Sequence, residues 1–139
     1  MRSLNKSNPV VTTTSHFDPS NKPKGLRRVF KALKNSLRAF SWLTKNEAAF
    51  KQELSLAAVA FVVLVFWSIP FLERAILISS IFFILFAEII NTAIEVTVDR
   101  IGTEFHALSG LAKDLASAGV FLSIVIACVL WAGVFYSHI

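Results

Sequence analysis

Four polar residues recur at helical spacing in a stretch of the chain that is otherwise apolar. They are Glu88, Asn91, Glu95 and Asp99, at positions i, i+3, i+7 and i+11. At about 100° per residue, these positions fall within roughly 80° of one another, a single stripe along one helix face. A charged side chain inside a membrane span costs on the order of 2.5–3.5 kcal/mol even on the lenient insertion scale. Two aligned carboxylates in one span therefore indicate a functional site.

The depth of the stripe suggests which ligands it serves. Glu88 lies eleven residues before Asp99, about 16 Å along a helix axis. With Asp99 at the cytoplasmic surface, the stripe runs from water to below the lipid headgroups. The deepest carboxylate can then reach the glycerol region of a lipid, while the outer ones can hold a cation and a soluble ligand. We expect a site that takes one lipid and one water-soluble substrate.

Two other interpretations of the stripe remain open from the residues alone. In one, its members serve as interhelical hydrogen-bonding groups in a non-catalytic membrane assembly. In the other, they line a proton or ion path. The ion-path interpretation has less support, because no charged or amide side chain continues the stripe from Glu88 back to Ala75.

Further polar groups lie near the cytoplasmic end of the stripe. Glu47 and Glu53 stand where an amphipathic segment meets the first apolar stretch, and a solvated helix junction would also explain them. The following loop region offers carboxylates, an imidazole and an ammonium group, from Glu104, His106, Lys113 and Asp114. A point cation suits phosphate and carboxylates suit a hard divalent ion. No GxxxxGK[ST] sequence occurs, so any nucleotide would be bound without a P-loop.

Three long apolar stretches must position these residues. They cover residues 54–72, 75–98 and 115–136, each about long enough to span a bilayer as a helix. The chain is 55% hydrophobic, with a mean hydropathy of +0.62, which is high for a soluble protein of this length. We predict an all-α membrane protein with three transmembrane helices per protomer and a cytoplasmic loop over residues 99–114.

The N-terminal part is different in character. Residues 1–24 are rich in Ser, Thr, Asn, Pro and Lys and predict a disordered cytoplasmic tail. Residues 25–45 alternate apolar and basic positions at helical spacing, which predicts an amphipathic helix lying in the membrane interface. Residues 25–139 would then form a single membrane domain.

Charge distribution sets the expected orientation. Of 14 Lys and Arg residues, 11 lie between Arg2 and Lys51. The positive-inside rule therefore places the N-terminus in the cytoplasm and, after three crossings, the C-terminus outside. A net charge of +5 confined to one end suits anionic lipid, and we expect no nucleic-acid binding.

The only cysteine, Cys128, excludes an intramolecular disulfide and a thiol pair for a metal. Three spans enclose little polar surface, so we also expect oligomerisation.

Several segments together resemble the prokaryotic diacylglycerol kinase family. The resemblance covers about residues 25–137, and its most specific segments are NEAAFKQE at 46–53, EIINTAIE at 88–95, VDRIGTE at 98–104 and AKD at 112–114. It implies a homotrimeric, multi-pass enzyme of the inner membrane with active sites shared between protomers. Such an enzyme transfers the γ-phosphoryl group of MgATP to the hydroxyl of diacylglycerol and forms phosphatidic acid.

The same resemblance implies roles for individual residues. Glu88 is similar to the catalytic base and Asn91 to a hydrogen-bonding organiser beside it, while Glu47 and Glu95 resemble the Mg²⁺ ligands. The implied ATP contacts are Arg28, Glu47, Glu95, Glu104, His106, Lys113 and Asp114. The implied lipid contacts are Arg28, Arg74, Glu88 and Ser117.

The chain departs from the family pattern at a few positions outside this core. Asn35 stands where an aromatic residue near the nucleotide is expected, and Leu111 replaces a basic residue. These two departures leave open whether the affinity for ATP matches that of the family. Ser68 and Pro70 replace acidic residues between the first two spans. The related undecaprenol kinases share the architecture and are the alternative among enzymes; residues 98–104 favour the diacylglycerol branch.

Overall fold

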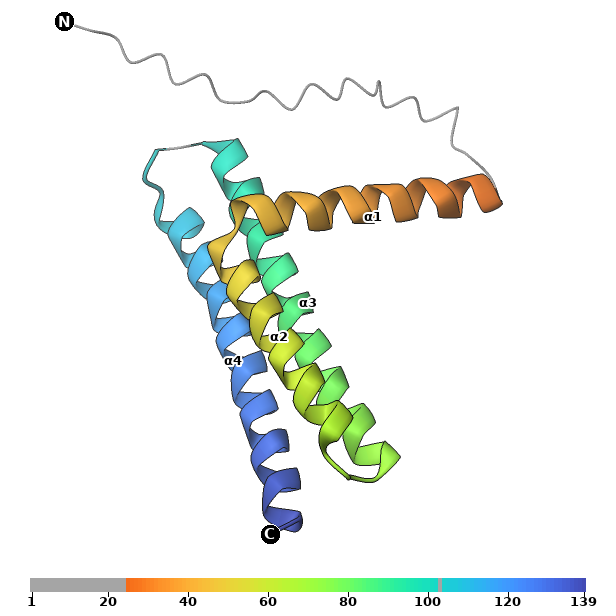
Figure 1. Cartoon of the computed structure of the whole chain (residues 1–139). Helices are drawn as coiled ribbons and strands as arrows, with labels where there is room; N and C mark the ends of the chain where they lie inside the picture. Colours follow the sequence, from red (N-terminus) through yellow and green to blue (C-terminus); the bar gives the residue numbers. More distant parts are fainter. Residues whose placement is uncertain (1–24, 103) are drawn as a thin grey trace, which may run out of the picture. The chain divides into compact units, whose positions relative to one another are not determined.

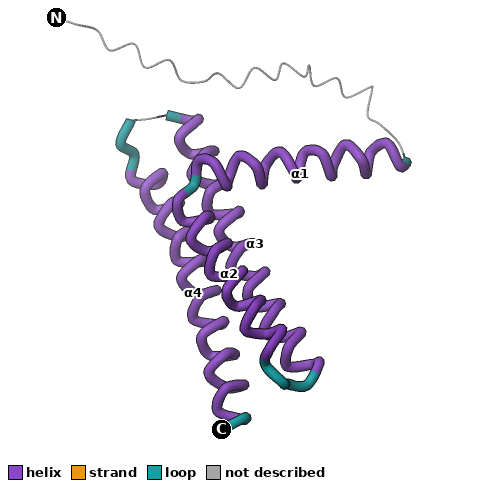
Figure 2. The backbone as a smooth tube through the Cα atoms, in the orientation of Figure 1, coloured by secondary structure: helices purple, strands orange, loops and turns teal. Residues whose placement is uncertain are grey.

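The computed structural model describes residues 25–102 and 104–139, and this part of the chain is helical without strands. Its helices are α1 (Leu26–Asn46), α2 (Ala48–Phe66), α3 (Phe71–Ile101) and α4 (Ala107–Ser137), joined by short connections (Figure 2). The expected all-α class is confirmed. The predicted tail over residues 1–24 lies outside the described residues, as does Thr103 of the family motif.

Three of these helices are long and apolar enough to cross a membrane. They are α2, α3 and α4, whose most apolar windows have mean hydropathies of 1.8, 2.1 and 2.5. Most of their large apolar side chains are exposed, as expected for helices that contact lipid tails or other helices. The chain is a multi-pass membrane protein.

The first turn between spans falls earlier than the apolar pattern indicates. The stretch over residues 54–72 was expected to be one helix, but α2 ends at Phe66 and α3 begins at Phe71. The cause is Pro70, which cannot donate a backbone hydrogen bond and prefers the start of a helix. It stands at the N-cap of α3 with φ −54° and ψ 148°, and its carbonyl accepts from the Arg74 amide at 3.1 Å.

The connection between α3 and α4 is also shorter than expected. Residues 99–114 were predicted as a loop, whereas α3 continues to Ile101 and α4 already begins at Ala107. Polar residues beyond a span still propagate a helix when their side chains reach water, so the change from apolar to polar sequence marks no helix end. His106 fixes the start of α4, because its side chain accepts a hydrogen bond from the Leu108 amide at 3.3 Å.

Helix α3 packs against α4 along its length and less extensively against α2 (Figure 1). Near the α2–α3 connection, Leu64, Ile69 and Leu77 form the buried core. Trp67 closes this end, with its ring centroid 6.4 Å from that of Trp131. This cluster could not be predicted from the sequence, because a membrane span is apolar on its buried and its exposed sides alike.

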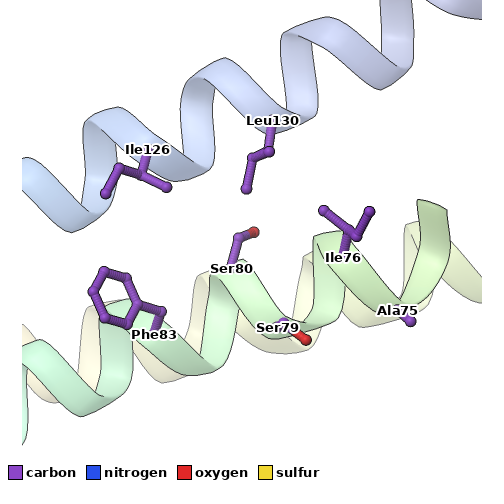
Figure 3. Close-up of a pocket in the computed structure, with 7 residues that line it drawn as sticks. All are labelled: Ala75, Ile76, Ser79, Ser80, Phe83, Ile126 and Leu130. Atoms are coloured by element: carbon purple, nitrogen blue, oxygen red, sulfur yellow. The ribbon is translucent and has the colours of Figure 1, made fainter. Parts of the chain in front are cut away.

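An apolar groove of about 440 Å³ lies between the first half of α3 and the second half of α4 (Figure 3). Ser80, one of its lining residues, is buried and donates to the Leu77 carbonyl at 2.7 Å. That local bond satisfies the hydroxyl, so the groove presents hydrocarbon rather than a polar path.

Helix α1 is amphipathic along its whole length. Most of its large apolar residues are exposed, namely Leu26, Val29, Phe30, Leu33, Leu37, Phe40 and Trp42, whereas Leu43 near its end is buried. Gly25 precedes it with φ +61°, a left-handed conformation that glycine adopts without strain. At its other end, Glu47 adopts extended backbone angles and separates α1 from α2.

Candidate active site

The polar stripe on α3 is buried at one end and exposed at the other. Glu88 is only 5% exposed and Asn91 only 9%, Glu95 is half-buried, and Asp99 is exposed. The predicted helix is confirmed, so these four residues do share one face. The gradient of burial means that the deepest carboxylate is the one removed from solvent.

Asn91 connects the stripe to α4. Its Nδ2 donates to Oε1 of Glu95 at 3.1 Å, and its Oδ1 accepts from Oγ of Ser117 at 3.4 Å. Both polar atoms of the amide are thereby engaged, which fixes the orientation of the side chain. The second bond is long and therefore weak, so Glu95 is the main partner. The arrangement leaves Oε2 of Glu95 available to a cation.

Two carboxylates of α2 complete the polar cluster. Glu47 is the N-cap of α2, and its side chain makes no capping hydrogen bond there. Both Glu47 and Glu95 are close enough to Glu88 for Coulombic repulsion between the carboxylates. Glu53 repels Glu88 in the same way, and its Oε2 is buried without a hydrogen-bond partner among the described residues. Such a concentration of like charge is unfavourable unless a cation or protons relieve it.

Glu53 was noted in the sequence as a polar group at the helix junction, but it was assigned no role in the site. It borders the first apolar stretch, where a carboxylate is commonly a solvated end of a helix. It also ends the family segment 46–53, but its position six residues after Glu47, about 1.7 turns, does not by itself bring two side chains together. The proximity of Glu53 to Glu88 arises from the packing of α2 against α3.

The exposed edge of the stripe carries an ion pair. Nζ of Lys113 lies 2.6 Å from Oδ1 of Asp99, joining the start of α4 to the end of α3. The two side chains are 38% and 60% exposed, so the pair is open to competition from water and other anions. Glu104 and Asp114 are exposed near the same connection.

His106 has a structural role at this edge. Since its Nδ1 accepts from the Leu108 amide, Nε2 carries the proton of the neutral ring and is free to donate. A donor at this position is compatible with a phosphate ligand.

Two residues predicted from the sequence remain: Arg74 lies apart from this cluster, and Arg28 lies on α1. Arg74 is at the opposite end of α3, fourteen residues before Glu88 or about 21 Å along the helix. Its Nη2 donates to the carbonyl of Trp67 at 2.9 Å, which anchors the α2–α3 connection. Arg28 is exposed on α1. Roles for both in ligand binding stay predictions.

Comparison with known proteins shows which family the chain resembles. Residues 34–135 match the family model described as prokaryotic diacylglycerol kinase. The diacylglycerol kinase of Escherichia coli K12 is 40% identical over 119 residues, covering 86% of this chain and 98% of the relative. The relatives of the same name from Haemophilus influenzae and Pseudomonas aeruginosa are 38% and 39% identical, covering 83% and 78% of this chain and 98% and 88% of their own length.

The chain belongs to the prokaryotic diacylglycerol kinase family. The match includes the whole of α2 and α3 and nearly all of α4. Membership in this kinase family gives the carboxylate cluster a chemical context, phosphoryl transfer, that a purely structural hydrogen-bonding role does not have.

Proposed function

We propose that this protein is an ATP-dependent lipid kinase that phosphorylates diacylglycerol to phosphatidic acid at the cytoplasmic face of the inner membrane. The observation that carries the proposal is the buried Glu88 at the inner end of an exposed-to-buried carboxylate stripe, in a chain of the diacylglycerol kinase family. A lipid hydroxyl near the headgroup region and a nucleotide in water would meet along this stripe.

Glu88 is the proposed general base. In the reaction, the lipid hydroxyl oxygen bonds to the γ-phosphorus while its proton passes to the Glu88 carboxylate. The bond between the γ-phosphorus and the β–γ bridging oxygen breaks, and ADP leaves. A base must lie within hydrogen-bond reach of the proton that it takes, and Glu88 is the member of the stripe that lies deepest along α3. Glu53 adjoins it and helps to make the position electronegative.

Glu47 and Glu95 are the proposed ligands of the magnesium ion that accompanies ATP. Within the described residues, no group of three or more metal-binding side chains forms a cage for a resident ion. Two carboxylates with free oxygens nevertheless fit Mg²⁺, which is typically held by one or two carboxylates together with substrate phosphates and water. When bound, the ion would neutralise charge on the β- and γ-phosphates.

Lys113 is the proposed phosphate cation. Its ammonium group is held at the stripe by Asp99, and this solvent-exposed pair can exchange partners at low cost. Triphosphate oxygens would then replace Asp99 as acceptors. We also propose that Arg28, Glu104, His106 and Asp114 contact ATP, and that Arg28, Arg74 and Ser117 contact the lipid.

The remaining proposals concern the assembly and its surroundings. We propose an N-terminus in the cytoplasm, a cytoplasmic tail over residues 1–24, an interfacial α1, and a homotrimer with shared active sites. The positive-inside bias of the sequence supports the orientation. The many exposed apolar side chains on all three spans leave ample surface for contacts between protomers.

A phosphoryl-transfer assay tests the proposed function directly. The purified protein, reconstituted with lipid, is given ATP labelled at the γ-phosphate, Mg²⁺ and one lipid at a time: diacylglycerol, monoacylglycerol, ceramide or undecaprenol. We expect the label to appear in phosphatidic acid most efficiently. Preferential labelling of undecaprenol would instead identify an undecaprenol kinase, and absence of transfer to every lipid would refute a kinase function.

A further inference from the structure

Helix α1 carries a line of cations that the proposed active site does not use. Arg27, Lys31, Lys34 and Arg38 are spaced at i, i+4, i+7 and i+11, within about 60° of one another on the helix. All four are exposed. We name this line the basic ridge. Arg28, which belongs to the proposed active site, falls roughly 60° to 120° away from these residues and is not part of the ridge.

The ridge contains no internal charge compensation. The sequence of α1 has no Asp or Glu, and the ion pairs found among the described residues involve other side chains. Four cations held on neighbouring turns repel one another. Such a surface is stabilised by a multivalent anion or by an anionic surface.

The position of the ridge relative to the apolar face selects the kind of anion. The apolar side chains of α1 centre about 120° from the ridge on the helix wheel, rather than on the opposite side. The third side is mostly small and neutral, with Ala32, Ser36 and Ala39. If the apolar face lies in a bilayer, the ridge therefore faces sideways at the level of the lipid phosphates instead of upward into solution.

Phosphate chemistry distinguishes among anionic lipids at this level. A phosphomonoester carries about −1.5 to −2 charges at neutral pH and three terminal oxygens, whereas a phosphodiester lipid headgroup carries one charge at its phosphate. Arg forms bidentate bonds with phosphate and Lys adds point charges. Phosphatidic acid, whose phosphate has no further substituent, thus complements two Arg and two Lys better than a diester does.

We infer that the basic ridge of α1 is a binding surface for phosphomonoester lipids in the bilayer, and so for the product of the proposed reaction. This inference rests on the proposed function for its identification of the lipid as product. Product that reaches the ridge through the bilayer would be retained there and enriched around the protein over other anionic lipids.

Trp42 provides a reporter, because it lies one helical turn beyond Arg38 and is 40% exposed. A Trp67→Phe/Trp131→Phe background leaves it as the only tryptophan in the full-length chain. This protein is reconstituted in phosphatidylcholine vesicles containing phosphatidic acid or phosphatidylserine with brominated acyl chains, which quench tryptophan. The phosphatidylserine is used at equal and at doubled mole fraction, to match molecule number and surface charge.

We expect phosphatidic acid to be enriched near Trp42 by about fivefold over phosphatidylserine, the ratio expected for one additional phosphate–cation contact. The ridge variant Arg27→Gln/Lys31→Gln/Lys34→Gln/Arg38→Gln should lose this preference. The variant Arg2→Gln/Lys6→Gln/Lys22→Gln/Lys24→Gln removes the same charge from the same end of the chain and should keep it.

Two results would overturn the inference. Equal quenching by the two lipids at matched surface charge would show that the ridge attracts anionic membranes in general, without a preference for phosphomonoesters. Equal loss in both Gln variants would show that total charge, rather than the ridge, determines the lipid distribution. The quenching is measured without ATP, and lipid phosphorylation is assayed on matched vesicles that also contain diacylglycerol. A failed kinase assay with retained lipid preference would therefore refute the proposed function and leave the ridge as a phosphomonoester site.

Discussion

At the scale of single residues, burial separates the members of the α3 stripe that look identical in sequence. Glu88 is nearly inaccessible, whereas Asp99 is exposed and already paired with Lys113. A buried carboxylate without a fixed cation partner is costly to maintain. Its persistence at this position is understandable if the carboxylate itself takes part in the reaction.

The first prediction therefore concerns Glu88. Glu88→Gln preserves shape and hydrogen bonding but removes the base, so we expect the phosphorylation rate to fall by at least about a hundredfold, with the protein still folded and able to bind MgATP. Glu73→Gln is the matched control, since it makes the same change in the first turn of α3, where Glu73 pairs with His138. We expect that control to stay within about threefold of the parent rate. Near-normal turnover in Glu88→Gln would remove the residue from the mechanism.

The second prediction concerns the metal. Glu47→Gln and Glu95→Gln should each raise the Mg²⁺ concentration needed for half-maximal rate by at least about tenfold, the range seen when groups around a metal are altered. The apparent affinity for diacylglycerol should change less. A Mg²⁺ titration at saturating ATP, compared with Ser55→Ala on the exposed side of α2, measures this. Unchanged titrations in both Gln variants would assign the two carboxylates a structural role only.

The third prediction separates the two bonds of Asn91. Asn91→Ala frees Glu95 and should shift the Mg²⁺ requirement in the same direction as Glu95→Gln. Ser117→Ala removes the longer bond of 3.4 Å, so at saturating lipid, where a lost lipid contact matters least, it should alter the rate by less than about threefold. If Ser117→Ala under these conditions proves as harmful as Asn91→Ala, the longer bond orients the amide as much as the bond to Glu95 does.

Part of this site could be predicted from sequence, because positions on one helix have a fixed geometry. The spacing of Glu88, Asn91 and Glu95 determines that they share a face wherever the helix is placed. The contact of Ser117 with Asn91, 26 residues away, depends on how α4 packs against α3 and has no periodic signature. The same is true of Glu53 beside Glu88.

At the scale of elements, hydropathy predicted how many helices could span a membrane but misplaced their ends. Apolar residues, among them Trp67, Ile69 and Phe71, continue through the α2–α3 connection. Hydropathy therefore does not distinguish the connection from the helices on either side of it. Only Pro70 marked the break. At the other end, α3 and α4 extend past the apolar segments as far as Ile101 and back to Ala107, since Asp99 and Lys113 satisfy one another between helices.

The fourth prediction belongs to α1 as an element. Leu33→Ser/Leu37→Ser removes two exposed apolar side chains from its proposed membrane face. Each Leu contributes about 1.5–3 kcal/mol when buried in hydrocarbon, so we expect at least a tenfold loss of kinase rate in lipid–detergent mixtures. Ala32→Ser/Ala39→Ser, on the neutral side of α1, should have little effect. Deletion of residues 1–21 should also leave activity intact. An inactive deletion beside an active Leu33→Ser/Leu37→Ser variant would reverse the assignment of these two regions.

At the scale of the whole molecule, one chain supplies few cations to a cluster rich in carboxylates. Lys113 is paired with Asp99, which lies about 16 Å along α3 from Glu88. Arg74 is at the far end of the same helix, bonded to Trp67. A phosphate group close enough to Glu88 to receive the lipid oxygen would therefore gain from a cation donated by another protomer.

The fifth prediction tests such sharing by mixing two inactive variants. If each site takes Glu88 from one protomer and Lys113 from its neighbour, Glu88→Gln and Lys113→Ala subunits should restore activity when assembled together. In a cyclic trimer mixed at random in equal amounts, about one site in four receives both native residues, which predicts a quarter of the parent rate. A double variant carrying both changes, mixed with Glu88→Gln, should restore nothing. Differently tagged subunits confirm co-assembly by sequential purification. Mixed oligomers that stay inactive would show that each protomer supplies both residues to its own site.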